Sequence, residues 1–204
     1  QVCLCFFGDS VVNIGAFHES MNMAARWKLP VVFLLENNQY GMGTDVQRVA
    51  AVKELKDRGL AYDGLASIDV DGMDVLAVRQ VVEEAIDRGR TEKLPSFIEA
   101  KCFRYMGHSM ADPSHGTYRT KEEVQKWRSD DPILAFRQLM IEAGRLTEEE
   151  YDKIDQEMIT VCEAAAEFAD TSPFPDPDTI YQYIYSDRYP DDLQRRDAWR
   201  KEFS

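Results

Sequence analysis

The sequence predicts an α/β fold, in which a parallel sheet is flanked by helices. Short apolar, β-branched segments at 2–7, 30–35 and 97–103 alternate with longer stretches of helical periodicity. Strands buried on both faces of a parallel sheet have near-continuous apolar sequences of this kind. At 204 residues, 44% hydrophobic and 30% charged, the chain has an ordinary globular composition and can bury one sizeable core.

Between these strands the sequence predicts one further strand and a long helix. Ile68 and Val70 form a fourth, shorter strand within 67–74, which ends in a turn. Asp74 is well placed as the N-cap of the helix that follows, because its side chain can accept from the first free backbone N–H groups. The apolar positions of that helix fall near one face: Val75, Val78, Val82 and Ile86.

The second half of the chain predicts a long loop, then helices. Residues 104–120 lack apolar periodicity and carry Gly, Pro, Ser and two of the three histidines, and loops of this length are usually functional or disordered. Thr120 and Glu123 form a possible capping box for the next helix. Two amphipathic helices then cover 130–170, followed by a Pro- and Asp-rich extended arm. We therefore expect an α/β core at 1–128, including the loop 104–120, and C-terminal helices with an arm at 129–204.

Charge and cysteine content narrow the class of protein. The net charge of −13 repels phosphate backbones and anionic lipid, so we expect no nucleic acid and no membrane as partner. No apolar run approaches the roughly 20 residues of a membrane helix. Cys3, Cys5, Cys102 and Cys162 lack metal-site spacing, so we expect free buried thiols in a reducing compartment, with Cys3 and Cys5 in the core. A cytoplasmic or organellar-matrix location follows as an expectation.

A lone carboxylate stands where the first strand ends. Asp9 follows the apolar run in "FFGDS", and Asn38 follows the second strand in "LLENNQYGMGT". The carboxyl ends of parallel strands meet at one edge of a sheet, where ligands of open α/β sheets bind. Carboxylate and amide oxygens suit Mg²⁺, which also takes substrate phosphates and water. The pattern favours a site for a metal and a diphosphate, while a simpler interpretation makes Asp9 an N-cap and Asn-Asn a turn.

The same segments carry a family resemblance. "GDS...ENNQYGMGT" resembles the thiamine diphosphate motif, in which Gly-Asp-Gly is followed further along by Asn-Asn. The segments "FHESMNMAARWKLPVVFLLENNQYGMGT", "VDGMDVLAVR" and "YMGHSMADPSHGTYRTKEEV" are similar to the alpha subunit of the decarboxylating component of 2-oxo acid dehydrogenase complexes, of the pyruvate or acetoin type. The resemblance runs from residue 1 to about 187 and implies the thiamine diphosphate-binding fold.

The resemblance also implies roles for individual residues. Asp9, the Asn38 side chain and the backbone carbonyl of Tyr40 would ligate Mg²⁺, together with diphosphate oxygens. Ser10 and Val11 would offer backbone N–H groups to the diphosphate, and Asn13 would brace the turn. His108 in "GHS" matches the loop histidine that approaches the diphosphate and shapes the entrance, and it is our one catalytic candidate.

Some positions depart from the family pattern. Ser10 replaces the second Gly of Gly-Asp-Gly, where Gly lets backbone approach a phosphate closely, and its hydroxyl could add a hydrogen bond. Met106 stands where some members have a second histidine, and His115 is expected to be an exposed loop residue. Ser109 matches the position at which mitochondrial members are phosphorylated, where added charge would oppose a bound diphosphate. We expect no kinase to act here by default.

The implied activity is oxidative decarboxylation of a 2-oxo acid with acyl transfer to lipoyl groups, using thiamine diphosphate and Mg²⁺. The implied partners are a beta subunit, in an assembly of two alpha and two beta chains, and a lipoyl-bearing acyltransferase. The chain begins without Met and enters directly into a strand, so we expect it to start part-way through a domain. We expect the isolated chain to be inactive and to bind the cofactor weakly or not at all.

Three alternatives stay open at this point. Acetoin dehydrogenase alpha subunits share the motifs, and "GHSMADP" does not separate acetoin from pyruvate. A non-catalytic remnant used as an assembly module would fit Ser10 and the unusual loop. A different phosphate-binding α/β enzyme could use Asp9 for Mg²⁺ in phosphoryl transfer, although the sequence has no GxxxxGK[ST] loop. We expect His18, Glu19, Trp27 and Trp127 to serve packing or subunit contact.

Overall fold

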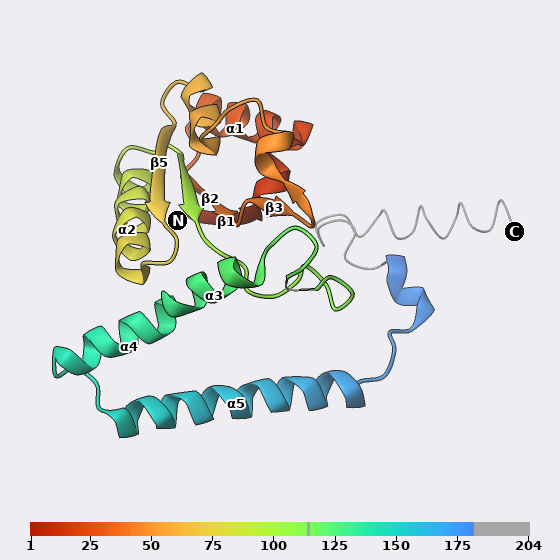
Figure 1. Ribbon diagram of the computed structural model, residues 1–204. Helices are drawn as coiled ribbons and strands as arrows, with labels where there is room; N and C mark the ends of the chain where they lie inside the picture. The colour runs from red at the N-terminus through yellow and green to blue at the C-terminus, as the bar shows by residue number, and fades with distance from the viewer. Residues whose placement is uncertain (114, 182–204) are drawn as a thin grey trace, which may run out of the picture. The chain divides into compact units, whose positions relative to one another are not determined.

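The computed structural model describes residues 1–113 and 115–181 (Figure 1). The chain divides into two compact units, residues 1–147 and residues 148–204, and each is described by itself. The aromatic part of the predicted C-terminal arm, from residue 182 onward, lies outside the described residues.

A four-stranded parallel sheet forms the centre of the first unit. Its strands are β1 (Cys3–Gly8), β2 (Val31–Asn37), β6 (Ser96–Lys101) and β5 (Ala66–Asp71), in the spatial order β1-β2-β6-β5. All three neighbouring pairs are parallel. A short antiparallel pair, β3 (Tyr40–Gly41) and β4 (Thr44–Asp45), follows β2. The α/β fold class and all four predicted strands are confirmed.

Helices lie between the strands of the sheet and after its last strand. In the first unit these are α1 (Gly15–Trp27), α2 (Val75–Thr91), α3 (Lys121–Ser129) and α4 (Pro132–Glu142), with short 3-10 helices η1 (Asp9–Asn13), η2 (Val46–Arg48) and η3 (Leu55–Ala61). The second unit contains α5 (Glu148–Thr171) and η4 (Pro177–Tyr181). The predicted boundary at 128/129 stays a prediction.

The sheet separates two apolar clusters because side chains alternate along each strand. Phe33, Leu35 and Phe97 face α1, and their cluster also takes in residues of η1 and η3. Val32, Leu34 and Ile98 face the opposite way and pack with α2. The two helices thus cover opposite faces of β2 and β6 (Figure 1). Burial on both faces accounts for the unbroken apolar run of residues 31–35 in β2.

Side-chain caps begin the helices where the sequence predicts them. The Asp74 carboxylate accepts from the backbone N–H groups of Leu76 and Ala77, at 2.9 and 3.1 Å. The Thr120 hydroxyl accepts from the backbone N–H of Glu123 at 3.1 Å. Each satisfies a donor that the first turn of a helix leaves without an intrahelical partner.

The expectation that Cys3 and Cys5 lie in the core is wrong, since both are exposed. β1 is the edge strand of the described sheet, and its residues 3–6 are all exposed. Only Phe7 near its carboxyl end packs against the cluster below α1. Trp27 is likewise exposed, whereas the Trp127 ring stacks on that of Phe103 with centroids 5.1 Å apart.

Candidate functional site

The polar site predicted at the carboxyl ends of the strands is centred on β1 and β2. β1 ends at Gly8, which pairs with Glu36 and is the N-cap of η1. Asp9 is the first residue of η1, and Asn38 directly follows β2. The parallel register of β1 and β2 therefore brings both predicted metal ligands to the same edge of the sheet.

Asp9 is a buried carboxylate, with an exposed fraction of 2%. Burial raises the pKa of its carboxyl above 3.8, while its own backbone N–H and the charge of Arg104 oppose that rise. Within residues 1–113 and 115–181 no side chain donates a hydrogen bond to this carboxylate. Burying an ionised carboxylate costs free energy unless a cation or donors compensate. A bound cation would therefore compensate the free-energy cost of burying the ionised Asp9 carboxylate.

The two neighbouring asparagines differ in what they bind. Asn37 is buried, donates from Nδ2 to Glu99 Oε1 at 2.7 Å, and accepts at Oδ1 from the Gln39 backbone N–H at 2.9 Å. Asn38 is half-buried, and its Oδ1 accepts a long hydrogen bond, 3.3 Å from the Tyr40 backbone nitrogen. Both polar atoms of the Asn37 side chain are therefore used in hydrogen bonds within the fold. The Asn38 side-chain oxygen is better placed to bind a further ligand.

The backbone turns sharply between these asparagines and Tyr40. Gln39 has a φ of 69°, in the left-handed region that non-glycine residues rarely adopt. Side-chain oxygens of Asn37 and Asn38 hold the turn by accepting from Gln39 and Tyr40. The turn presents the Tyr40 backbone, the third predicted metal ligand, next to Asn38.

The turn after β2 lies against the turn after β1. A Cβ placed on Gly41 would lie 1.8 Å from Ser10 Oγ, so the Ser10 hydroxyl occupies space that only glycine leaves open. Ser10 and Val11, the predicted donors to the diphosphate, lie in η1. Asn13, at the end of η1, accepts at Oδ1 from Arg58 of η3 at 2.7 Å. The serine that replaces the motif glycine is thus accommodated by the absence of a side chain at Gly41.

Arg119 connects the long loop to this turn. It is buried, with an exposed fraction of 3%, and its guanidinium lies 5.0 Å from the ring centroid of Tyr40 and 4.7 Å from that of Phe103. Its Nη1 donates to the Arg104 carbonyl, and its Nη2 approaches the Asn38 carbonyl at 3.4 Å. Burial and the nearby Arg104 charge lower its pKa. Aromatic faces and carbonyl oxygens are suitable partners for a buried guanidinium.

His108 lies in the long loop, where a polar network orders the backbone. Its Nδ1 lies 3.1 Å from Arg104 Nη1, and its backbone N–H donates to Asp112 Oδ2 at 2.8 Å. The same Asp112 oxygen accepts from the Tyr118 hydroxyl at 2.5 Å, which in turn accepts from Arg104 Nη2 at 3.0 Å. A Cβ on Gly107 would lie 1.7 Å from the Asp112 carbonyl oxygen, so the loop needs glycine there.

Several smaller expectations have a direct outcome in the structure. His115 and Ser109 are exposed, the former as predicted. His18 contacts the Tyr62 hydroxyl at 3.1 Å and Arg58 Nη1 at 3.2 Å, a packing role of the kind expected. Cys102 is half-buried beside the site, and burial first, then the charges of Glu36 and Asp9, raise the pKa of its thiol to about 11.

The donor set can be compared with the needs of Mg²⁺ bound to a diphosphate. Among the described residues no group of three or more His, Cys, Asp or Glu side chains could hold a metal. The predicted set contributes a single carboxylate, an amide oxygen and a backbone carbonyl, and leaves the remaining positions to phosphate and water. Mg²⁺ is commonly bound in this way, with few protein carboxylates. Asp9, Asn38 and Tyr40 therefore fit a metal that arrives with its phosphate ligand.

Sequence reasoning missed several residues of this region. Glu99 is buried with an exposed fraction of 1%, although the sequence predicts an apolar run for its strand. A charged residue inside "FIEAK" is the available signal, because buried carboxylates need partners. Arg104, Asp112, Tyr118 and Arg119 stand out in the sequence only as parts of a loop motif. Their mutual contacts join residues too far apart in sequence for local patterns to reveal.

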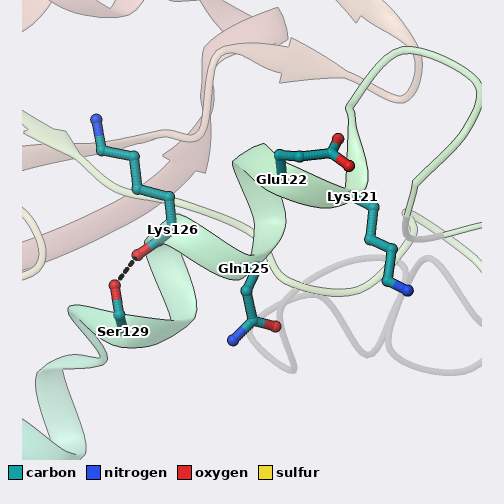
Figure 2. Close-up of a pocket in the computed structure, with 5 residues that line it drawn as sticks. All are labelled: Lys121, Glu122, Gln125, Lys126 and Ser129. Atoms are coloured by element: carbon teal, nitrogen blue, oxygen red, sulfur yellow. Dashed lines mark hydrogen bonds between the residues drawn. The ribbon is translucent and has the colours of Figure 1, made fainter.

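A shallow pocket of about 530 Å³ lies on the surface of α3, lined by Lys121, Glu122, Gln125, Lys126 and Ser129 (Figure 2). The Ser129 hydroxyl donates to the Lys126 carbonyl at 2.5 Å, and the lysine side chains extend outward (Figure 2). None of the predicted site residues lines this pocket. The pocket is therefore a feature of the helix surface, separate from the sheet edge.

The fold and the sheet edge together define an α/β protein with a polar site where parallel strands end. Over residues 1–178 the chain matches the family described as Dehydrogenase E1 component. The chain belongs to this family, and the resemblance found in its motifs is confirmed.

Curated relatives agree with this family. The chain is 44% identical over 185 residues to "Pyruvate dehydrogenase E1 component subunit alpha" of Rhizobium meliloti, covering 90% of this chain and 52% of that protein. It is 41% identical over 202 residues to the somatic mitochondrial form of Homo sapiens, covering 98% of this chain and 51% of that protein. The testis-specific form of Rattus norvegicus is 42% identical over the same length. The chain thus spans about half the length of these relatives.

In the described part of the chain, no helix combines the length and the apolar character that crossing a membrane requires.

Proposed function

We propose that this chain is part of an alpha subunit of a thiamine diphosphate-dependent pyruvate dehydrogenase E1 component, which decarboxylates pyruvate oxidatively and passes the acyl group to lipoyl groups. The family match over residues 1–178 and the names of the relatives support this proposal. Acetoin dehydrogenase is the alternative within the family, and the pyruvate-specific names of these relatives favour pyruvate. The relatives are bacterial and mitochondrial, which supports a cytoplasmic or matrix location.

The observation that carries the proposal is the buried carboxylate of Asp9 at the carboxyl end of β1. Its burial raises its pKa, and within the described residues no side chain donates to it. A buried carboxylate without a donor destabilises the folded protein unless a bound ligand compensates its charge. The Asn38 oxygen and the Tyr40 carbonyl on the adjacent turn complete a donor set for Mg²⁺.

In this proposal the residues of the chain bind and orient the diphosphate end of the cofactor. Asp9, Asn38 and the Tyr40 carbonyl hold Mg²⁺, and the backbone N–H groups of Ser10 and Val11 donate to phosphate oxygens. Thiamine diphosphate, when bound, supplies the nucleophile and the electron sink for decarboxylation, so the protein provides binding and electrostatics. His108 stands in the loop as the residue that approaches the diphosphate at the entrance.

We propose that partner chains supply further parts of the active assembly. We propose a beta subunit as partner, in an assembly of two alpha and two beta chains, and a lipoyl-bearing acyltransferase as acceptor. The chain spans about half the length of its relatives, so we propose that alone it is inactive and binds cofactor weakly. Calorimetry that shows tight, Mg²⁺-dependent binding to the isolated chain would contradict the last statement.

Substitution of Asp9 by asparagine tests the proposal through both stability and binding. Because burial raises the pKa of Asp9 above its unfolded value near 3.8, the folded form binds this proton more tightly. Stability without ligand therefore falls as pH rises from that value through the folded pKa. Asp9→Asn removes this loss, so at neutral pH the ligand-free variant should have the higher thermal midpoint.

The opposite order is expected when the ligands are present. In a full-length alpha subunit assembled with its beta subunit, Mg²⁺ and thiamine diphosphate should raise the midpoint of the parent and leave that of Asp9→Asn nearly unchanged. Mg²⁺-dependent binding measured by calorimetry should fall at least about 100-fold, since a charged ligand is lost. Asp45→Asn, a change at a nearby acid that caps η2, is the control. Equal Mg²⁺-dependent binding of thiamine diphosphate by the parent and Asp9→Asn would overturn the proposed metal site. If the parent assembly does not bind the cofactor at all, the alternative of a non-catalytic assembly module is favoured.

A further inference from the structure

Glu99 is a buried acid that the proposed cofactor site does not use directly. It lies on β6, pairs with Leu35 of β2 and has an exposed fraction of 1%. Both of its carboxylate oxygens have donors: Asn37 Nδ2 reaches Oε1 at 2.7 Å, and the Lys56 backbone N–H reaches Oε2 at 2.7 Å. A buried carboxylate that is satisfied on both oxygens is strongly held in one orientation.

The Asn37 amide transmits this orientation to the turn. Its Nδ2 donates to Glu99, and its Oδ1 accepts from the Gln39 backbone N–H at 2.9 Å. The amide has only one orientation that satisfies both, because a flipped amide would set an oxygen against the carboxylate and a donor against the N–H. Gln39 has a φ of 69°, so the turn has an uncommon backbone conformation that this hydrogen bond supports.

The second oxygen of Glu99 connects the same acid to η3. Lys56 belongs to this short helix, and Arg58 two residues later donates to Asn13 Oδ1 at the end of η1. Glu99 is therefore linked by hydrogen bonds to the turn after β2 and, through η3, to the turn after β1. These two turns carry the residues proposed to bind the metal and the diphosphate.

We propose that Glu99 is a positioning residue for the turn that carries Asn38 and Tyr40. This inference rests on the proposed function, because it assigns the purpose of the turn to metal and diphosphate binding. In this proposal Glu99 contacts neither the metal nor the diphosphate. It holds the Asn37 amide in one orientation, and Asn37 in turn holds the Gln39 backbone N–H. The turn therefore keeps Asn38 and the Tyr40 carbonyl in one arrangement at the edge of the sheet.

Exchange of the two side chains provides a matched test. Glu99→Gln sets a donor against Asn37 Nδ2 or Lys56 N, and Asn37→Asp sets two carboxylates against each other. The double variant Asn37→Asp with Glu99→Gln restores every pairing, since the introduced glutamine amide donates to the new carboxylate and still accepts from Lys56. The net charge of the pair is unchanged. Ile98→Val, a buried neighbour on the opposite face of β6, controls for loss of stability alone.

The measurement is the Mg²⁺ concentration for half-maximal thiamine diphosphate binding, in a full-length alpha subunit assembled with its beta subunit. We expect Glu99→Gln to raise it about tenfold, the effect of one unmatched buried donor. Ile98→Val should match the parent, and the double variant should return to within about twofold of it. Equal values for Glu99→Gln and Ile98→Val, or a double variant no better than the single ones, would overturn the proposal.

Hydrogen exchange at the Gln39 amide separates this inference from the proposed function. If the parent assembly ignores thiamine diphosphate, the proposed function fails, and exchange still reports on the turn. Faster exchange in Glu99→Gln, reversed in the double variant, supports the role of Glu99 in holding the turn; unchanged exchange overturns it. If Glu99→Gln fails to assemble, the double variant alone tests the proposal. The proposal then requires that the double variant assembles and behaves like the parent.

Discussion

At the scale of single residues, the contact between Ser10 and Gly41 sets how closely the two turns of the site approach. A Cβ on Gly41 would lie 1.8 Å from Ser10 Oγ and 3.2 Å from Ser10 Cβ. The hydroxyl can rotate away, but the Cβ contact is tighter than ordinary packing allows. The pair explains how a serine is tolerated where the motif has glycine: the neighbouring strand has no side chain at the point of contact.

This contact predicts a coupling between two substitutions. Gly41→Ala should lower the free energy of unfolding by about 1–2 kcal/mol, the cost of a local overpacking. In the background of Ser10→Gly, the same change should cost less, with a coupling of about 1 kcal/mol. Urea unfolding of the four proteins measures it.

Gly8→Ala is the matched control, because a Cβ there has nothing within 4 Å. Additive effects of Ser10→Gly and Gly41→Ala would show that the two turns do not meet through these side chains.

At the scale of elements, polar contacts join described residues of the segment 104–120. Arg104, Tyr118 and Asp112 form a chain of hydrogen bonds that ends on the His108 backbone. The Tyr118 hydroxyl, and secondly the His108 N–H, lower the pKa of the Asp112 carboxyl below 3.8. An acid with a lowered pKa stabilises the folded loop at higher pH, and that stabilisation is lost as pH falls through the lowered pKa.

Removing the Tyr118 hydroxyl should therefore move the titration of Asp112. Tyr118→Phe is expected to raise the pKa of Asp112 toward 3.8 and to speed hydrogen exchange at the His108 amide several-fold, because one charge-assisted hydrogen bond is lost. Carboxyl NMR titration and exchange measure these effects. Tyr105→Phe, whose hydroxyl donates to the Trp127 carbonyl, should change neither. An unshifted Asp112 in Tyr118→Phe would rule out the network.

At the scale of the whole molecule, the two apolar clusters formed by the described residues lie within the first unit. Both clusters are built from the sheet, α1, α2 and the short helices, all before residue 148. α5 has no buried residue and carries exposed apolar side chains, including Ile154, Met158 and Phe168. The stability of the first unit is thus expected to come from its own packing.

A chain of residues 1–147 is therefore expected to fold by itself. It should unfold cooperatively on heating, with a midpoint within a few degrees of the whole chain, because it keeps every residue of the two apolar clusters described above. Differential scanning calorimetry and near-ultraviolet circular dichroism measure this. A chain ending at residue 128, which loses Ser129 and α4, serves as comparison for the boundary predicted from sequence. A broad, non-cooperative transition in residues 1–147 would show that the second unit is needed.

From the amino-acid sequence alone we could predict the parallel α/β class, the four strands, the caps at Asp74 and Thr120, and the family. These features depend on local periodicity, on turn chemistry and on a run of motifs, all of which are readable along the chain. The sequence also placed Asp9 and Asn38 at one edge, because parallel strands end together. Their roles as metal ligands remain a proposal.

The side chains that meet across the fold could be identified only from the three-dimensional structure. It showed Cys3 and Cys5 exposed on an edge strand, because strand order is not written in the periodicity of any one strand. It distinguished the role of Asn37 from that of Asn38, because Asn37 is hydrogen-bonded to Glu99, which lies 62 residues further along the chain. It also buried Arg119 among aromatic rings. Such contacts depend on the register of distant segments, and the free energy of packing them together sets that register.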